Sequence, residues 1–129
     1  MELVRVPTLT QEVPYAYAAV APGGTVYAAG ACPLDKAGDV VAPGDVAGQA
    51  GRVMRNLEQA LHAAECGLVD VVKTTVYVAS SDRADLVTAW NVVRKAFGDH
   101  DPPSTLLGVA VLGYPDQLVE VEAFAVRPA

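Results

Sequence analysis

The residues best suited to acid–base chemistry lie in the last strand-like segment, residues 118–126. Glu120 and Glu122 are two positions apart there and alternate with small aliphatic residues. Because successive side chains of a strand point to opposite faces, both carboxylates fall on one face, roughly 7 Å apart at Cβ. Two interpretations remain open. On a face buried against another subunit, one carboxylate can act as a general acid or base, whereas on a solvated or salt-bridged face both are only surface charge.

Three further side chains are of types that occur in binding sites. Cys32 lies in a turn just after Gly30, and neither a histidine nor a predicted helix N-terminus adjoins it. A small buried side chain is therefore the simpler interpretation of Cys32, and a nucleophile the alternative. Tyr15 either lines a pocket or packs in the core. Asn91, on a predicted helix, is expected to hydrogen-bond a backbone group.

Charge and composition exclude several classes of function. Nine Lys and Arg against fifteen Asp and Glu give a net charge of −6, and the cations are scattered, which disfavours binding of nucleic acid. The cysteines and histidines have no metal-like spacing and no Gly-rich phosphate-binding motif occurs, so we expect no metal and no cofactor. No apolar run reaches the roughly 20 residues of a membrane span, and the N-terminus does not resemble a signal peptide. We expect a cytoplasmic protein with two free thiols, a disulfide between them being the alternative.

Two helices are predicted from apolar residues spaced three and four apart. The first spans residues 45–66, with Asp45 as N-cap and Gly67 in a left-handed C-terminal cap. The second begins after Asp82 and ends at Gly98. Its predicted apolar stripe consists of Leu86, Val87, Trp90, Val93 and Phe97.

Six segments have the composition of strands, and their order predicts the fold class. They are residues 3–6, 16–21, 25–29, 71–78, 104–112 and 118–126. The turn Pro22-Gly23-Gly24 predicts a hairpin, and the strand–helix–strand order predicts some parallel pairing. Two helices can cover only one face of such a sheet, whereas strand 71–78 is apolar on both faces. We therefore predict one α+β domain, residues 1–129, that forms an oligomer through its other sheet face.

The order of motifs along the chain resembles the Rid (reactive intermediate deaminase, YjgF) family. The likeness covers nearly the whole chain, and these segments carry it: Pro14-Tyr15, Val26-Tyr27-Ala28-Ala29-Gly30 with Pro33, Asp45 with Gln49, Asn56-Leu57, residues 67–78 (GLVDVVKTTVYV), Asn91, Phe97 and residues 119–126 (VEVEAFAV). The resemblance implies a chorismate-mutase-like fold, which is a mixed sheet with two helices on one face. It also implies a homotrimer with small-molecule clefts between subunits.

The resemblance further implies a site in which one residue is replaced. The well-known members hydrolyse reactive enamines and imines, such as 2-aminoacrylate, to a keto acid and ammonia. They hold the substrate carboxylate with the Arg of a Pro-Ala-Arg-Ser segment, a role that suits a bidentate guanidinium. Here the matching segment is Pro102-Pro103-Ser104-Thr105, so Ser104 stands in place of that Arg. Glu120 matches the acidic residue that positions or activates water, Tyr15 the pocket tyrosine and Asn91 the helix asparagine.

Two hypotheses from different classes follow. In the first, the protein is an enzyme in which Glu120 orients or deprotonates water, with Ser104, Thr105 and the backbone of Gly30, Ala31 and Cys32 as hydrogen-bond donors. Loss of the Arg favours a neutral substrate, or one less dependent on a carboxylate. In the second, the trimer binds a small molecule without catalysis. A third function, nuclease activity or inhibition of translation, is a label that some family members carry, and the charge of −6 disfavours it.

Overall fold

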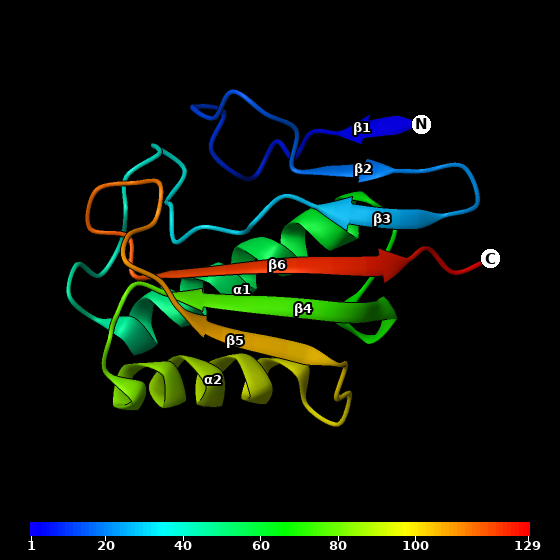
Figure 1. Ribbon diagram of the computed structural model, residues 1–129. Helices are drawn as coiled ribbons and strands as arrows, with labels where there is room; N and C mark the ends of the chain where they lie inside the picture. Colours follow the sequence, from blue (N-terminus) through cyan, green and yellow to red (C-terminus); the bar gives the residue numbers. More distant parts are fainter.

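The computed structural model describes residues 1–129 as one mixed sheet with two helices against one of its faces (Figure 1). The strands are β1 (Glu2–Val4), β2 (Ala18–Val20), β3 (Thr25–Ala28), β4 (Val71–Val78), β5 (Ser104–Gly108) and β6 (Val119–Val126). Their order across the sheet is β1-β2-β3-β6-β4-β5. Only β4 and β5 are parallel, because a helix carries the chain back between them. The predicted fold class is confirmed.

The two helices begin where the sequence predicts, and the second also ends there. The Asp45 carboxylate accepts a hydrogen bond of 2.9 Å from the backbone of Gly48 and caps α1 (Val46–Ala63). Asp82 caps α2 (Arg83–Phe97) in the same way, through the backbone of Ala84. Gly98 ends α2 with a φ of 65°, which glycine adopts at little cost.

The predicted end of the first helix, residue 66, was wrong by three residues. The helix stops at Ala63, and the left-handed conformation falls on Glu65, with a φ of 63°. The Cys66 N–H then donates to the Leu61 carbonyl at 2.8 Å, which closes the last turn. Gly67, with a φ of −125°, instead precedes a short 3-10 helix over Leu68–Asp70.

Alternation along the central strands separates a buried face from an open one. The alternate β6 residues Val119, Val121, Ala123 and Ala125 are fully buried under the helices. From α1, Val53, Leu57 and Leu61 pack on this layer, and from α2, Ala89, Val93 and Phe97. Val87 was expected in the α2 stripe but is exposed, because the stripe of α2 is narrow and Val87 lies beside it.

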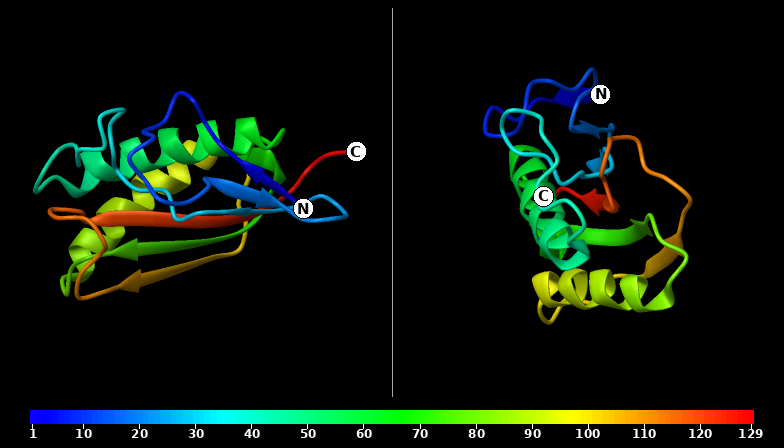
Figure 2. Two further views of the ribbon diagram at one scale, coloured as in Figure 1. Left: turned by 90° about the horizontal axis from the view of Figure 1, so that it is seen from above. Right: turned by 90° about the vertical axis from the view of Figure 1, so that its left-hand side faces the viewer.

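The other face of the sheet has no helix on it, as both views of Figure 2 show. Tyr27 and Phe124 stack edge to face there, with ring centroids 5.4 Å apart. Val72, Leu107 and Val126 are also exposed. The apolar face expected to lie uncovered is therefore present in the chain. Neither helix is long and apolar enough to cross a membrane.

The segment between β5 and β6 differs most from the prediction. β5 ends at Gly108, four residues before the expected end of that strand, and residues 109–118 form a loop. The two strands are not neighbours, because β4 lies between them. The loop must therefore cross the end of β4 before it enters β6, and this crossing brings it beside the N-terminal half of the chain (Figure 1).

Candidate functional site

Glu120 lies near the start of β6, where three loops meet. The cleft in front of it has a volume of about 600 Å³. It is lined by Pro14, Tyr15, Ala29, Gly30, Cys32, Gly113, Tyr114 and Glu120. Glu120 is the only charged residue in this lining. The expected pocket residues Tyr15, Gly30, Cys32 and Glu120 are thus brought together within one chain.

Gly30 is required at this place by the close approach of the carboxylate. A Cβ at position 30 would lie 2.7 Å from Cδ of Glu120 and closer still to its Oε2. Any other residue would therefore displace the Glu120 side chain or the turn. Ala31 follows and forms a two-way backbone bridge with Val121, of 2.7 and 3.2 Å, which fixes the turn to β6. Ala31 thus contributes through its backbone.

The carboxylate of Glu120 is held by two donors from different loops. The Cys32 thiol lies 3.3 Å from Oε1 and is also 3.4 Å from the carbonyl of Gly30. The Gln117 amide donates to the same Oε1 at 3.1 Å. Burial first, and the negative charge of Glu120 second, raise the pKa of Cys32 to about 12. Cys32 is therefore a protonated donor at neutral pH, and not a nucleophilic thiolate.

Two tyrosines close one side of the cleft. The hydroxyls of Tyr15 and Tyr114 are 3.0 Å apart and hydrogen-bonded. Burial and this bond raise the pKa of Tyr15, so that its hydroxyl stays protonated. Gln117 connects the pair to the carboxylate, because its Oε1 accepts from the backbone N–H of Tyr114 at 3.1 Å. Tyr15 is thus linked to Glu120 through Tyr114, whose side chain bonds Tyr15 and whose backbone bonds Gln117.

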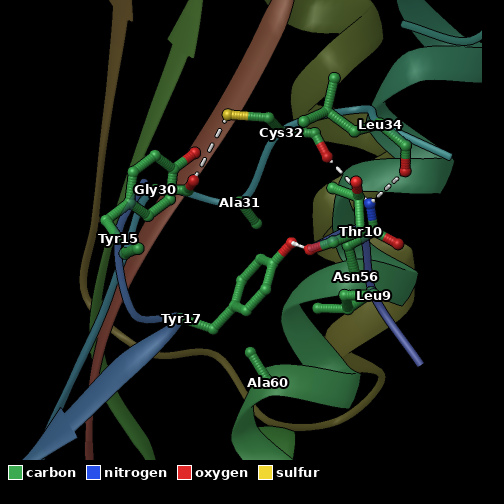
Figure 3. Close-up of a pocket in the computed structure, with 11 residues that line it drawn as sticks. Leu9, Thr10, Tyr15, Tyr17, Gly30, Ala31, Cys32, Leu34, Asn56 and Ala60 are labelled. Carbon is green, nitrogen blue, oxygen red and sulfur yellow. Dashed lines mark hydrogen bonds between the residues drawn. The ribbon is translucent and has the colours of Figure 1, made fainter. Parts of the chain in front are cut away.

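Two buried amides on α1 hold the loops that carry these residues. Asn56 donates to the carbonyls of Cys32 and Leu34, both at 2.9 Å (Figure 3). Gln49 accepts from the N–H of Leu118 at 2.7 Å and donates to the carbonyl of Asp116 at 2.9 Å. Figure 3 also shows the small pocket behind the Cys32 turn, where Tyr17 donates to the carbonyl of Thr10.

Three residues expected in the site lie away from Glu120. Ser104 pairs with the buried Thr74 of β4 and hydrogen-bonds its hydroxyl, on the helix-covered side of the sheet. Asn91 is exposed on α2, where it lines a shallow surface pocket with Arg94 and Lys95. Thr105 does lie on the open face but not in the cleft. Within one chain these residues provide the cleft with no donors.

The strand register places Ser104 and Thr105 on opposite faces of the sheet. Thr105 pairs with Thr75 on the face that carries Glu120 and Glu122, whereas Ser104 points to the other face. Neither residue is charged. Ser104, at the expected position of the replaced Arg, therefore does not enter the cleft of its own chain, and its expected role in the site stays a prediction.

Sequence reasoning missed three residues of this region. Tyr114 and Gln117 belong to a loop, for which no periodicity indicates direction. Lys73, on the open face of β4, donates to the Thr105 hydroxyl at 2.6 Å. It pairs with Phe124, four residues along β6 from Glu120, so it does not line the cleft. No group of three or more His, Cys, Asp and Glu side chains is arranged to hold a metal ion.

Comparison with known proteins gives consistent matches over almost the whole chain. The model of the family described as endoribonuclease L-PSP matches residues 7–127. A RutC family protein of Pyrococcus horikoshii is 36% identical over 115 residues, which are 88% of this chain and 87% of the relative. The 2-iminobutanoate/2-iminopropanoate deaminase of Rattus norvegicus is 34% identical over 80% of this chain and 73% of its own. Among solved structures, the YjgF gene product of E. coli superposes with a TM-score of 0.84 and 31% identity, covering 99% of this chain and 100% of the other.

Proposed function

Because this chain belongs to the endoribonuclease L-PSP family, which is the Rid/YjgF family, we propose that it hydrolyses a reactive enamine or imine to a carbonyl compound and ammonia. The observation that carries the proposal is the Glu120 carboxylate in a cleft without another charge. We propose that the working unit is a homotrimer, in which the open sheet faces pack together and neighbouring subunits complete the clefts. The uncovered apolar face supports this assembly.

The reaction needs one base and one water molecule. The C=N nitrogen is protonated before attack, so the substrate reacts as the iminium. As the water oxygen bonds to the C=N carbon, Glu120 accepts one proton of the water, which gives a neutral carbinolamine. Glu120 returns this proton to the amine nitrogen. The C–N bond then breaks and ammonia leaves, while Glu120 takes the hydroxyl proton as the carbonyl forms and passes it to the departing ammonia. An enamine takes a proton at carbon and so enters as the same iminium. The two tyrosine hydroxyls at the cleft wall can hydrogen-bond the substrate.

The charge of the cleft indicates the class of substrate. A substrate carboxylate would face Glu120 with no cation among the lining residues of the chain, and an unpaired anion in a cleft is unfavourable. A neutral imine, or a protonated iminium, suits the single negative charge and the two aromatic rings. We propose such a substrate, without an α-carboxylate, in preference to 2-iminopropanoate.

The test compares two imines under the same conditions. The first is 2-aminoacrylate, generated in place by a serine dehydratase and followed by pyruvate release. The second is an imine of a simple ketone without a carboxylate, formed from the ketone and ammonia and followed in the hydrolytic direction after dilution. We expect the protein to accelerate hydrolysis of the second imine more than that of the first. Equal rates with and without protein for both would contradict the proposal.

A trimer that binds a small molecule without turning it over is the second candidate. The observation that favours it is the absence of a cation from the cleft lining, since the carboxylate clamp of the resembled enzymes has no counterpart there. The binder predicts that a neutral carbonyl compound raises the melting temperature, because a ligand that binds only the folded state stabilises it. It predicts no release of ammonia from either imine.

Ribonuclease activity is not part of the proposal, although the family model is described by that name. The chain carries a net charge of −6, and the one charged residue of the cleft is a carboxylate. Both repel phosphate groups.

A further inference from the structure

The two oxygens of the Glu120 carboxylate lie in different surroundings. Oε1 accepts the hydrogen bonds of Cys32 and Gln117. Oε2 lies against Gly30 and accepts none from the protein. Every fully buried side-chain nitrogen and oxygen in the chain has a partner, so Oε2 is open to the cleft. The carboxylate is thus fixed by one oxygen and accessible by the other.

We propose that Cys32 and Gln117 are positioning residues that fix Oε1 of Glu120 and leave Oε2 as the oxygen that receives the proton of the attacking water. This inference rests on the proposed function, since it assigns the parts of the same site. It adds the orientation of the base, and it gives Cys32 a role as a donor instead of as a nucleophile. A base that is held in one orientation does not have to be reoriented when the substrate arrives.

The two donors are anchored differently, and this distinguishes their effects. Cys32 is on the turn that Asn56 ties to α1, so it is fixed by the core. Gln117 also accepts from the N–H of Tyr114 and donates to the carbonyl of Val119 at 3.1 Å. Gln117 is buried, and its hydrogen bonds link the Glu120 carboxylate to Tyr114 in the cleft wall. Removing the thiol should change only the orientation of the Glu120 carboxylate, whereas removing the Gln117 amide should also release Tyr114 in the cleft wall.

Steady-state kinetics of three variants test the proposal on whichever imine the wild-type protein hydrolyses. We expect Cys32→Ala to lower kcat about 10-fold with KM unchanged, since a hydrogen bond to a charged group is lost. Cys32→Ser keeps a donor and should recover part of that loss. Gln117→Met, of similar volume, should lower kcat and raise KM together, because Tyr114 loses its support. The matched control is Cys66→Ala, which removes the other buried thiol, far from the cleft, and should leave both constants unchanged.

The outcome that overturns the proposal is a kcat for Cys32→Ala and Gln117→Met within twofold of the wild type in folded protein. A loss in Cys32→Ala that Cys32→Ser does not relieve at all would also overturn it, because packing alone would then explain the effect. Wild-type protein without turnover of either imine would instead contradict the proposed function.

The reactivity of the Cys32 thiol tests its positioning role without any substrate. In a Cys66→Ala background, the rate of alkylation of Cys32 by iodoacetamide at pH 9 is compared with and without Glu120→Gln. If the thiol proton is held by the carboxylate, replacing Glu120 removes both its charge and its acceptor, and alkylation should be at least several-fold faster. Equal rates would show that Cys32 and Glu120 are not coupled, and would overturn the positioning role whether or not the protein is an enzyme.

Discussion

Glu120 and Glu122 are on the same face of the same strand, yet they have different surroundings. Glu122 lies in the regular part of the open sheet face and accepts one hydrogen bond of 3.1 Å, from the hydroxyl of Tyr77 on the adjacent strand. Glu120 lies at the N-terminal end of β6, where loops provide both of its donors and Gly30 lies against its carboxylate. Strand alternation places both carboxylates on one face. The loops at the strand end make only one of them part of a cleft.

The largest expected effect is on kcat, when the charge of Glu120 is removed and the same change is made at Glu122 for comparison. Glu120→Gln should lower kcat for imine hydrolysis at least 100-fold, because it removes the base while keeping a side chain of the same shape. Glu122→Gln is the matched control, with the same change two residues away, and should stay within twofold of the wild type. Gel filtration of both variants checks that the assembly is unchanged. Similar losses in the two variants would remove the distinction between the cleft and the open face.

Gly30 is a second difference between the surroundings of the two carboxylates, since it lies against Glu120 and no glycine lies against Glu122. We expect Gly30→Ala to lower kcat about 10-fold with little loss of stability, because the added Cβ would displace the free end of the Glu120 side chain. Gly51→Ala is the control: a Cβ there meets nothing within 4 Å, and it lies inside α1. That change should leave kcat unaltered and raise the free energy of unfolding by up to about 1 kcal/mol. A Gly30→Ala variant as active as the wild type would show that Glu120 does not need its observed position.

Stability at alkaline pH tests the surroundings of Cys32. Its pKa is raised from 9.0 to about 12 in the folded protein. Between these values the folded chain binds more protons than the unfolded chain. The protonated thiol therefore contributes its full share of the free energy of unfolding below pH 9, and this share is lost as the pH rises toward 12. At pH 10 the loss should be about 1 kcal/mol. Urea denaturation of wild-type protein and Cys32→Ser at pH 7 and pH 10 measures it. A wild-type protein that loses no more stability than Cys32→Ser would show that the thiol is not held in its protonated form.

The elements that position the site could be predicted from the sequence more fully than the site itself. Asp45, Asp82 and Gly98 delimit helices through local backbone chemistry, which a sequence displays directly. The alternation of residues 119–126 likewise gave the face of Glu120. The pairing of Ser104 with the buried Thr74 could not be predicted, because it depends on the register of β5 against β4. Tyr114 and Gln117 reach Glu120 through a loop whose path depends on β4 lying between β5 and β6, a fact of topology that local patterns do not contain.

The smallest expected effect compares the tyrosines that accompany the two carboxylates. Tyr114→Phe removes one of the two hydrogen-bonded hydroxyls at the cleft wall, and Tyr77→Phe removes the partner of Glu122. We expect Tyr114→Phe to raise KM about two- to threefold with kcat nearly unchanged, because the ring and its backbone bond to Gln117 remain. Tyr77→Phe should leave both constants unchanged. If Tyr114→Phe lowers kcat instead, the hydroxyl pair takes part in proton transfer and the chemistry of the cleft extends from Glu120 to Tyr15. If Tyr77→Phe has the larger effect, the open sheet face contributes to the reaction, and the distinction between the two carboxylates is one of degree.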